Sequence, residues 1–156
     1  MAWLKATNRT RYAGSMYRDE IDGQLLTEIQ YHDLVELGCQ DLAEGTRVLL
    51  AITELVVEAP GDRPAREWTH WHVRHWLLSS GLTAFVSMFQ RCRIAGTQLL
   101  QMTEHDIRDI GIHSPADIAL ILAKIAGLAG ETSMPILSRA SRQRSRDSLR
   151  ASRNLE

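Results

Sequence analysis

The sequence predicts an all-α protein made of two small helical units that share one pattern. Apolar residues recur at spacings of three and four along most of the 156 residues, which is the periodicity of helices with one buried face. No run of four residues combines alternation with the β-branched residues that strands prefer. IDGQLLTEIQYHDLVELG at 21–38 returns as IAGTQLLQMTEHDIRDIG at 94–111. The fold is therefore predicted to be a repeat of one helical unit.

The two copies stay in register at an offset of 73 residues, without a gap. This register extends well beyond the quoted stretch, so we predict two domains, at 1–57 and 67–130. EAPGDRPAR at 58–66 supplies the Gly and Pro expected of a linker. Residues 131–156 are rich in Ser and Arg and poor in large apolar residues, so we expect a disordered tail.

The helices of the second unit are predicted in order from their ends and apolar faces. Thr69 is a suitable N-cap for a first helix, which Gly81 ends. The aromatic residues Phe85 and Phe89 mark a second helix and, with Trp76, are assigned to the core.

Three further helices complete the second unit. Residues 97–102 form a short third helix. Thr103 caps a fourth helix that runs to Gly111. Pro115, near a first helical position, opens the last and longest helix, which reaches about Leu128. We thus expect a five-helix bundle.

An ordered series of short motifs runs through residues 67–129: W-T-x-x-x-V-x-x-W-L, then I-x-G, L-L, T-x-x-D-I and I-L-x-x-I-x-x-L. This series resembles the sterile alpha motif (SAM) domain. The first unit resembles the same family from Trp3 to about Val57, through I-D-G, L-L, D-L, L-G and G-x-R. The resemblance implies two five-helix SAM-like bundles in tandem, the first lacking most of its first helix.

The first unit departs from that pattern at its start. Residues 1–2 stand where the second unit has residues 74–75, so the cap and the apolar start of a first helix are missing. Arg9 stands where Leu82 helps to close the second core. Because losing one large buried side chain costs about 2–5 kcal/mol, we expect either a chain shortened from a longer protein or a first unit that depends on the second unit or a partner.

The resemblance implies protein–protein interaction, since SAM domains often join head to tail. An acidic mid-region of one domain then meets the start of the last helix of another. Physical chemistry favours this pairing, because a helix N-terminus attracts carboxylates. The first unit contains both halves: Arg47 early in its last helix, and an acidic mid-region comprising Asp19, Glu20, Asp22, Asp33 and Glu36. A solvated helix face is the alternative interpretation of those acids.

The second unit is less suited to this head-to-tail contact. Arg91 and Arg93 replace acids of the first unit, so its basic mid-region could instead meet the acidic one. Trp71 lies off the predicted core face, and an exposed indole there favours a covered contact. Packing of Trp71 on the linker or the neighbouring unit is the alternative.

Charge is distributed unevenly along the chain. The formal net charge is -1, but residues 1–57 carry five basic and nine acidic side chains, and residues 131–156 carry six Arg against three acids. The patterns Arg142-x-x-Ser145 and Arg150-x-Ser152 resemble phosphorylation sites directed by basic residues. A passive solubilising tail and an RNA-binding tail are the alternatives.

Catalytic and metal-site patterns are not found in the sequence. It has no G-x-S-x-G, G-x-G-x-x-G, phosphate loop or H-E-x-x-H pattern, so we predict no enzyme, no cofactor, no metal and no small-molecule substrate. His70, His72 and His75 are expected at the surface. Cys39 is expected in the core and Cys92 half exposed. Two cysteines, no secretory signal and no membrane-length apolar run favour a cytoplasmic protein, with a nuclear location as the alternative.

Two functions remain. The first is a scaffold or adaptor in signalling or regulatory assemblies, which binds itself or other SAM-domain proteins. The alternative is an RNA-binding regulatory module that uses the tail with Arg91, Arg93 and Arg108.

Overall fold

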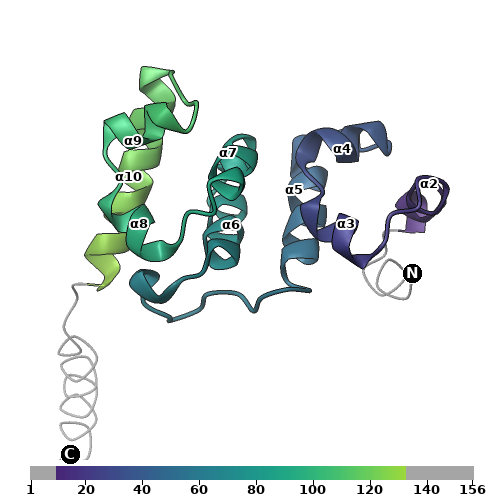
Figure 1. Cartoon of the computed structure of the whole chain (residues 1–156), viewed down its shortest axis with the longest axis horizontal. Helices are drawn as coiled ribbons and strands as arrows, with labels where there is room; N and C mark the ends of the chain where they lie inside the picture. Colours follow the sequence, from purple (N-terminus) through teal and green to yellow (C-terminus); the bar gives the residue numbers. More distant parts are fainter. Residues whose placement is uncertain (1–9, 133–156) are drawn as a thin grey trace, which may run out of the picture.

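The computed structural model describes residues 10–132, and all the regular structure in that range is helical (Figure 1). The predicted all-α class is therefore confirmed for this part of the chain. Trp3, Arg9 and the predicted truncation of the first helix lie outside it, as does the tail after Thr132.

Within residues 10–57, the first unit contains a short 3-10 turn and four helices. They are η1 (Thr10–Tyr12), α2 (Ala13–Arg18), α3 (Gly23–Glu28), α4 (Tyr31–Glu36) and α5 (Leu42–Thr53). The second unit contains two 3-10 turns and the five predicted helices: η2 (Ala65–Glu67), α6 (His70–Ser79), η3 (Thr83–Phe85), α7 (Val86–Arg91), α8 (Gly96–Gln101), α9 (Glu104–Asp109) and α10 (Pro115–Thr132).

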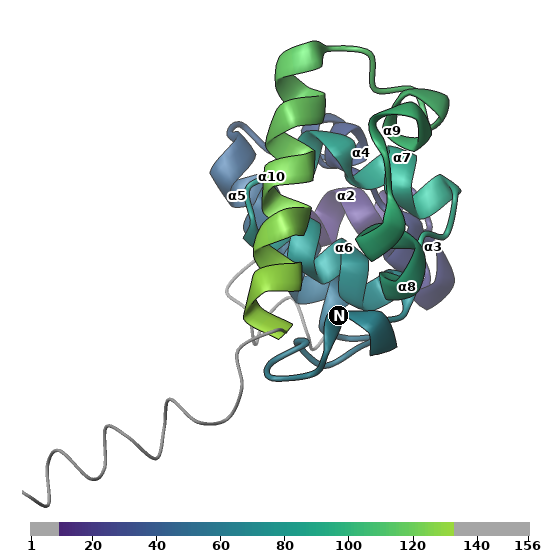
Figure 2. The same ribbon diagram turned by 90° about the vertical axis from the view of Figure 1, so that its left-hand side faces the viewer.

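The predicted helix ends agree with local hydrogen bonding. Thr69 caps α6, and its backbone N–H donates to Nδ1 of His72 at 3.1 Å. The backbone N–H of Thr103 donates to Oδ2 of Asp106 at 2.7 Å at the start of α9. α10 is the longest helix described, at 18 residues, and runs along one side of the second unit (Figure 2).

The repeat extends from the sequence to the backbone. The elements η1, α2, α3, α4 and α5 begin 73 residues before η3, α7, α8, α9 and α10, respectively. Left-handed conformations also repeat at this offset, with φ of 51° at Glu20 and 48° at Arg93, and of 101° at Gly38 and 106° at Gly111. The two units therefore share one path of the chain from η1 to α5 and from η3 into α10.

Equivalent positions also form the two cores. At one of them the first unit has a small residue where the second unit has a large one. Leu34 and its counterpart Ile107 are both 0% exposed. Gly45 stands where the second unit has the buried Ile118, and a Cβ at Gly45 would lie 2.5 Å from the ring of Tyr31. The ring on α4 thus fills the space left by the missing side chain on α5.

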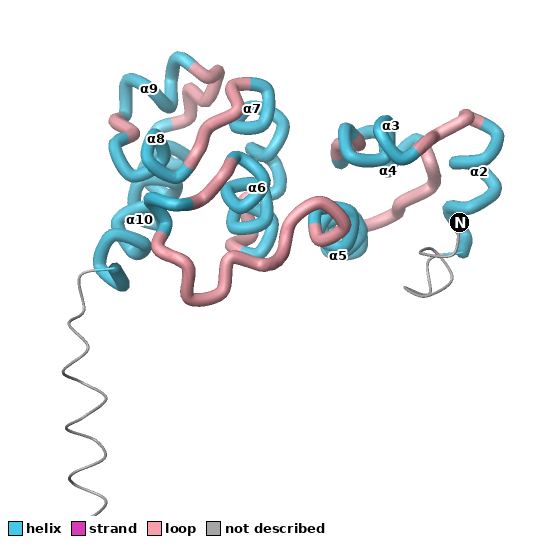
Figure 3. Tube along the Cα trace, turned by 60° about the horizontal axis from the view of Figure 1, so that its bottom comes forward, coloured by secondary structure: helices cyan, strands magenta, loops and turns pink. Residues whose placement is uncertain are grey.

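The two units pack on each other through α5 and α6. This is the most extensive contact between two helices in the described range, and α6 also packs on α7, α8 and η3 (Figure 1). The hydroxyls of Thr46 on α5 and Thr83 in η3 lie 2.8 Å apart. Figure 3 shows the loop that joins α5 to α6. The helix α6 is therefore shared between the second core and the junction of the units.

The end of the predicted linker packs on the second unit. The η2 turn lies against α8, and the backbone N–H of Gly96 donates to the carbonyl of Trp68 at 2.8 Å. A Cβ at Gly96 would lie only 1.7 Å from the carbonyl oxygen of Ala65. Only glycine fits at this approach of two backbones.

The cysteines and the core aromatic residues lie largely as predicted. Trp76 and Phe89 are buried, Phe85 is half-buried, Cys39 is buried and Cys92 is exposed. The prediction of a surface histidine at His72 is wrong: this ring is 3% exposed. Both ring nitrogens have partners, because Nδ1 accepts from the backbone N–H of Thr69 and Nε2 lies 3.1 Å from Nη1 of Arg63. Burial lowers the pKa of His72, with smaller contributions from Arg63 and His75.

Candidate functional site

Three residues of the acidic mid-region lie on the turn between α2 and α3, which we call the acidic turn (residues 19–22). Asp19, Glu20 and Asp22 are all exposed. Asp22 is the N-cap of α3, and its Oδ1 accepts hydrogen bonds from the backbone N–H groups of Gln24 at 2.9 Å and Leu25 at 2.8 Å. Asp22 therefore stabilises the helix, whereas Asp19 and Glu20 present their charge to solvent.

The other two acids of the mid-region belong to α4. Oδ2 of Asp33 accepts a hydrogen bond from the backbone N–H of Gln30 at 2.8 Å, and its Oδ1 lies 3.0 Å from Nε2 of His32. Glu36 is exposed at the end of the helix. The equivalent of Asp33 in the second unit, Asp106, makes the same cap, and hydrogen bonds from Thr103 lower its pKa. Capping thus accounts for Asp33 but not for Glu36.

Arg47 lies in the second turn of α5 and is exposed. Its Nε donates to the carbonyl of Ala43 at 3.2 Å. The first turn of the same helix is acidic: Asp41 is its N-cap, accepting from the backbone N–H of Glu44 at 2.7 Å. These carboxylates reduce the attraction of this helix start for an acidic partner.

Exposed apolar side chains accompany the acids of the first unit. Tyr17 on α2 is 79% exposed, and Leu25 on α3 and Val35 on α4 are each 49% exposed. At the equivalent positions the second unit has polar residues: Gln90, Gln98 and Arg108. These exposed apolar residues were not predicted from the sequence, although they differ from the second copy at each equivalent position.

A buried arginine holds the two units together. Arg74 on α6 is 1% exposed, and it donates from Nη1 to the carbonyl of Thr27 at 3.1 Å and from Nη2 to that of Ile29 at 2.9 Å. Nη1 also donates to Oε1 of Gln90 on α7. Burial lowers the pKa of Arg74 to about 10, so the side chain remains a cation at neutral pH. The burial of Arg74 was not predicted from the sequence.

A groove of about 470 Å³ lies above this arginine, and both units line it. We call it the junction groove. Trp71 is half-buried in its wall, with the Arg74 guanidinium 5.7 Å from its ring centre. The ring of His70 lies 5.2 Å from that of Trp71, and burial, followed by the charge of Arg93, lowers the pKa of His70. The other residues that line the groove are Thr27, Glu28, Gln30, Ser87, Gln90, Arg91 and Arg93.

The position of Trp71 bears on both interpretations of its role. The ring lies beside residues of the first unit, as the alternative of packing on the neighbouring unit expects. It also remains open to the groove. An external partner at Trp71 stays a prediction.

Metal-binding and membrane-spanning features are not found in the described part of the chain. Within 10–132, no group of three or more His, Cys, Asp or Glu side chains could hold a metal ion. No helix in the same range is long and apolar enough to span a membrane. Ser145 and Ser152 lie outside the described residues.

Comparison with known families decides the nature of the second unit. Residues 66–129 match the model of the SAM domain (Sterile alpha motif). The chain contains a SAM domain. Such domains are protein–protein interaction modules, and they typically bind other SAM proteins or self-associate. No solved structure matches the chain.

Proposed function

We propose that this chain is a non-enzymatic scaffold or adaptor that self-associates or recruits other SAM-domain proteins in signalling or regulatory assemblies. The SAM domain at 66–129 supports interaction in general. The repeated element boundaries, offset by 73 residues, support a second SAM-like domain in the first unit.

The observation that carries the proposal is the surface of the first unit. Exposed acids lie on the turn between α2 and α3 and at the end of α4. The three helices α2, α3 and α4 also expose Tyr17, Leu25 and Val35, which have polar counterparts in the second unit. Exposed apolar side chains rimmed by charge are typical of protein-binding surfaces. An enzyme would instead need convergent catalytic groups in a pocket.

Charge reversal tests this proposal. Asp33 is a poor choice because it caps α4, so the variant is Glu20→Lys with Glu36→Lys. The backbone tolerates a basic residue at position 20, since Arg93 adopts the same left-handed conformation. We expect the mass measured by light scattering to move toward the 17.6 kDa of one chain, because like charges at an interface repel.

The matched control carries the same change of net charge elsewhere. Glu58→Lys with Asp62→Lys, both at exposed positions between the units, is expected to leave the mass unchanged. Deletion of residues 133–156 is expected to leave it unchanged as well. Loss of association on that deletion alone would instead favour the tail as the binding element, and with it the RNA-binding alternative.

A further inference from the structure

The junction groove carries positive charge that the described part of the chain does not neutralise. Arg93 makes no ion pair among residues 10–132, and Arg91 bonds only to the carbonyl of Ile110, at 3.4 Å. The acid in the groove lining is Glu28. Arg74 adds a buried cation under Trp71, and its Nε has no hydrogen-bond partner. The groove therefore suits an anionic segment that also presents an aromatic or apolar side chain.

The acidic turn of the first unit has these properties. The acidic turn is equivalent to the turn of the second unit that contains Arg93, because Asp19 and Glu20 correspond to Cys92 and Arg93. Glu20 and Arg93 also share one backbone conformation. Even with Arg18 counted, residues 18–22 carry more acidic than basic charge. Tyr17 on α2, 79% exposed, lies two residues before the turn.

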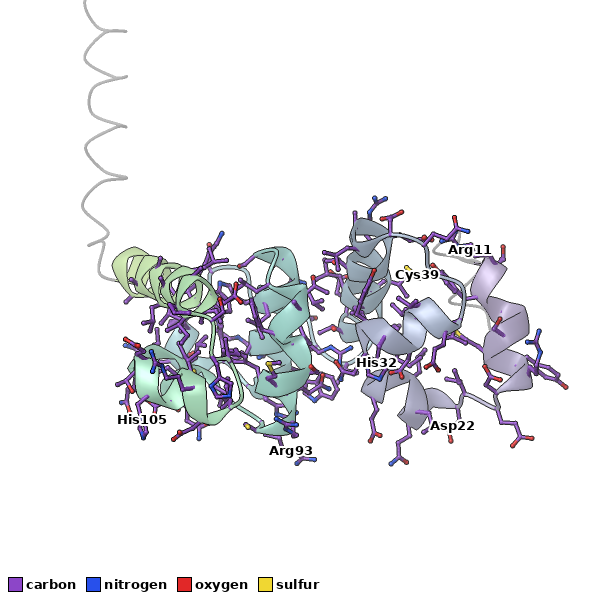
Figure 4. All side chains as sticks on the ribbon, turned by 90° about the horizontal axis from the view of Figure 1, so that it is seen from above. Arg11, Asp22, His32, Cys39, Arg93 and His105 are labelled. Atoms are coloured by element: carbon purple, nitrogen blue, oxygen red, sulfur yellow. The ribbon has the colours of Figure 1, made fainter. Side chains whose placement is uncertain are left out.

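The acidic turn and the turn that contains Arg93 do not neutralise each other's charge within one chain. No ion pair joins them among the described residues. Figure 4 shows Asp22 and Arg93 at the same side of the molecule, on different units. Two copies that face each other across this side can each offer an acidic turn to the groove of the other.

We propose that the junction groove receives the acidic turn of a second copy of this chain, with Asp19 and Glu20 pairing with Arg91 and Arg93, and Tyr17 covering Trp71. The proposal rests on the proposed function, because it uses the acidic mid-region as a binding surface and names its partner. It differs from the head-to-tail joint, since neither Arg47 nor the start of α5 takes part. Reciprocal insertion makes a contact with two-fold symmetry, which closes as a dimer and does not grow into a filament.

Mixing two charge-reversed variants tests this contact. The first variant, Asp19→Arg with Glu20→Arg, has two basic surfaces, and the second, Arg91→Glu with Arg93→Glu, has two acidic ones. Asp22 is left in place because it caps α3. Each variant alone is expected to associate at least about tenfold more weakly than the wild type, because like charges meet at both contacts. A 1:1 mixture is expected to form a heterodimer of twice the single-chain mass, measured by sedimentation or light scattering.

Two further variants distinguish the groove contact from the head-to-tail joint and from attraction by charge alone. Tyr17→Ser, at an exposed position that leaves the core intact, is expected to weaken association without changing charge. Arg47→Glu is expected to have no effect. Circular dichroism and thermal unfolding of each variant exclude loss of the fold.

The outcomes distinguish the two proposals. Association that Arg47→Glu abolishes and Arg91→Glu with Arg93→Glu preserves would overturn the groove contact and leave the proposed scaffold function standing. Failure of the mixture to form a heterodimer would also overturn the groove contact. A wild-type chain that is monomeric at every concentration and binds no SAM-domain protein would overturn both.

Discussion

The second unit surrounds its first helix, α6, with its own α7, α8 and η3, whereas the described part of the first unit meets α6 from outside through α5. The exposed large apolar side chains follow the same division. Six of those in the described range belong to the first unit, and one, Leu120, to the second; the six are Tyr17, Leu25, Val35, Leu42, Leu55 and Val56. The same order of helices thus gives a second unit that packs around its own first helix and a first unit whose described part packs on that helix from outside.

Separating the two units is expected to have the largest effect on thermal stability. Residues 58–132 should unfold in one cooperative thermal transition, because η2 to α10 form a closed core of their own. Residues 1–57 should show weak, non-cooperative unfolding, because α5 loses its packing on α6 and a domain of that size has little stability to spare. A sharp, reversible transition of the 1–57 fragment, followed by circular dichroism, would remove the distinction between the units.

Alanine substitutions at the equivalent glycines Gly23 and Gly96 compare how tightly the two units pack at this position. Gly96→Ala places a Cβ 1.7 Å from the carbonyl oxygen of Ala65, so a backbone must move, and we expect a loss of about 2–3 kcal/mol in the free energy of unfolding. Gly23→Ala, in the first unit, meets no atom within 4 Å and should be neutral or stabilising by up to about 1 kcal/mol. Urea unfolding of the two variants measures the difference. Equal effects would show that the packing of η2 on α8 contributes nothing to stability.

The role of Arg74 at the junction predicts an effect that depends on the first unit. In the whole chain, Arg74→Met leaves the carbonyls of Thr27 and Ile29 without charged donors, and we expect a loss of about 1–2 kcal/mol, since removing the buried charge offsets part of the lost bonds. In the fragment 58–132 these carbonyls are absent, and the same substitution should change stability by no more than about 0.5 kcal/mol. An equal loss in both chains would place the importance of Arg74 within the second unit alone.

Local patterns in the sequence predicted the helices and the repeat well. Caps such as Thr69 and Thr103 act within three residues, and apolar spacing reports which face of a helix is buried. The acidic turn was also visible, because charge can be counted along the chain. The role of Asp22 as a helix cap was not recognised.

Features that depend on contact between the units could not be predicted in this way. Arg74 is buried only because α6 lies against the end of α3, and no local pattern in α6 reveals that neighbour. The junction groove around Trp71 has the same origin. The ring of Tyr31 on α4 likewise fills the space beside Gly45 on α5. Because this packing involves two helices, the pattern of either helix alone does not predict it.

Light scattering of the whole chain over a range of concentrations tests the central claim most directly, because that claim is that the exterior of these units binds protein. The account predicts a mass that rises above the 17.6 kDa of one chain as concentration increases, or that rises when another SAM-domain protein is added. A mass that stays at that of one chain throughout, with and without such a protein, would contradict it.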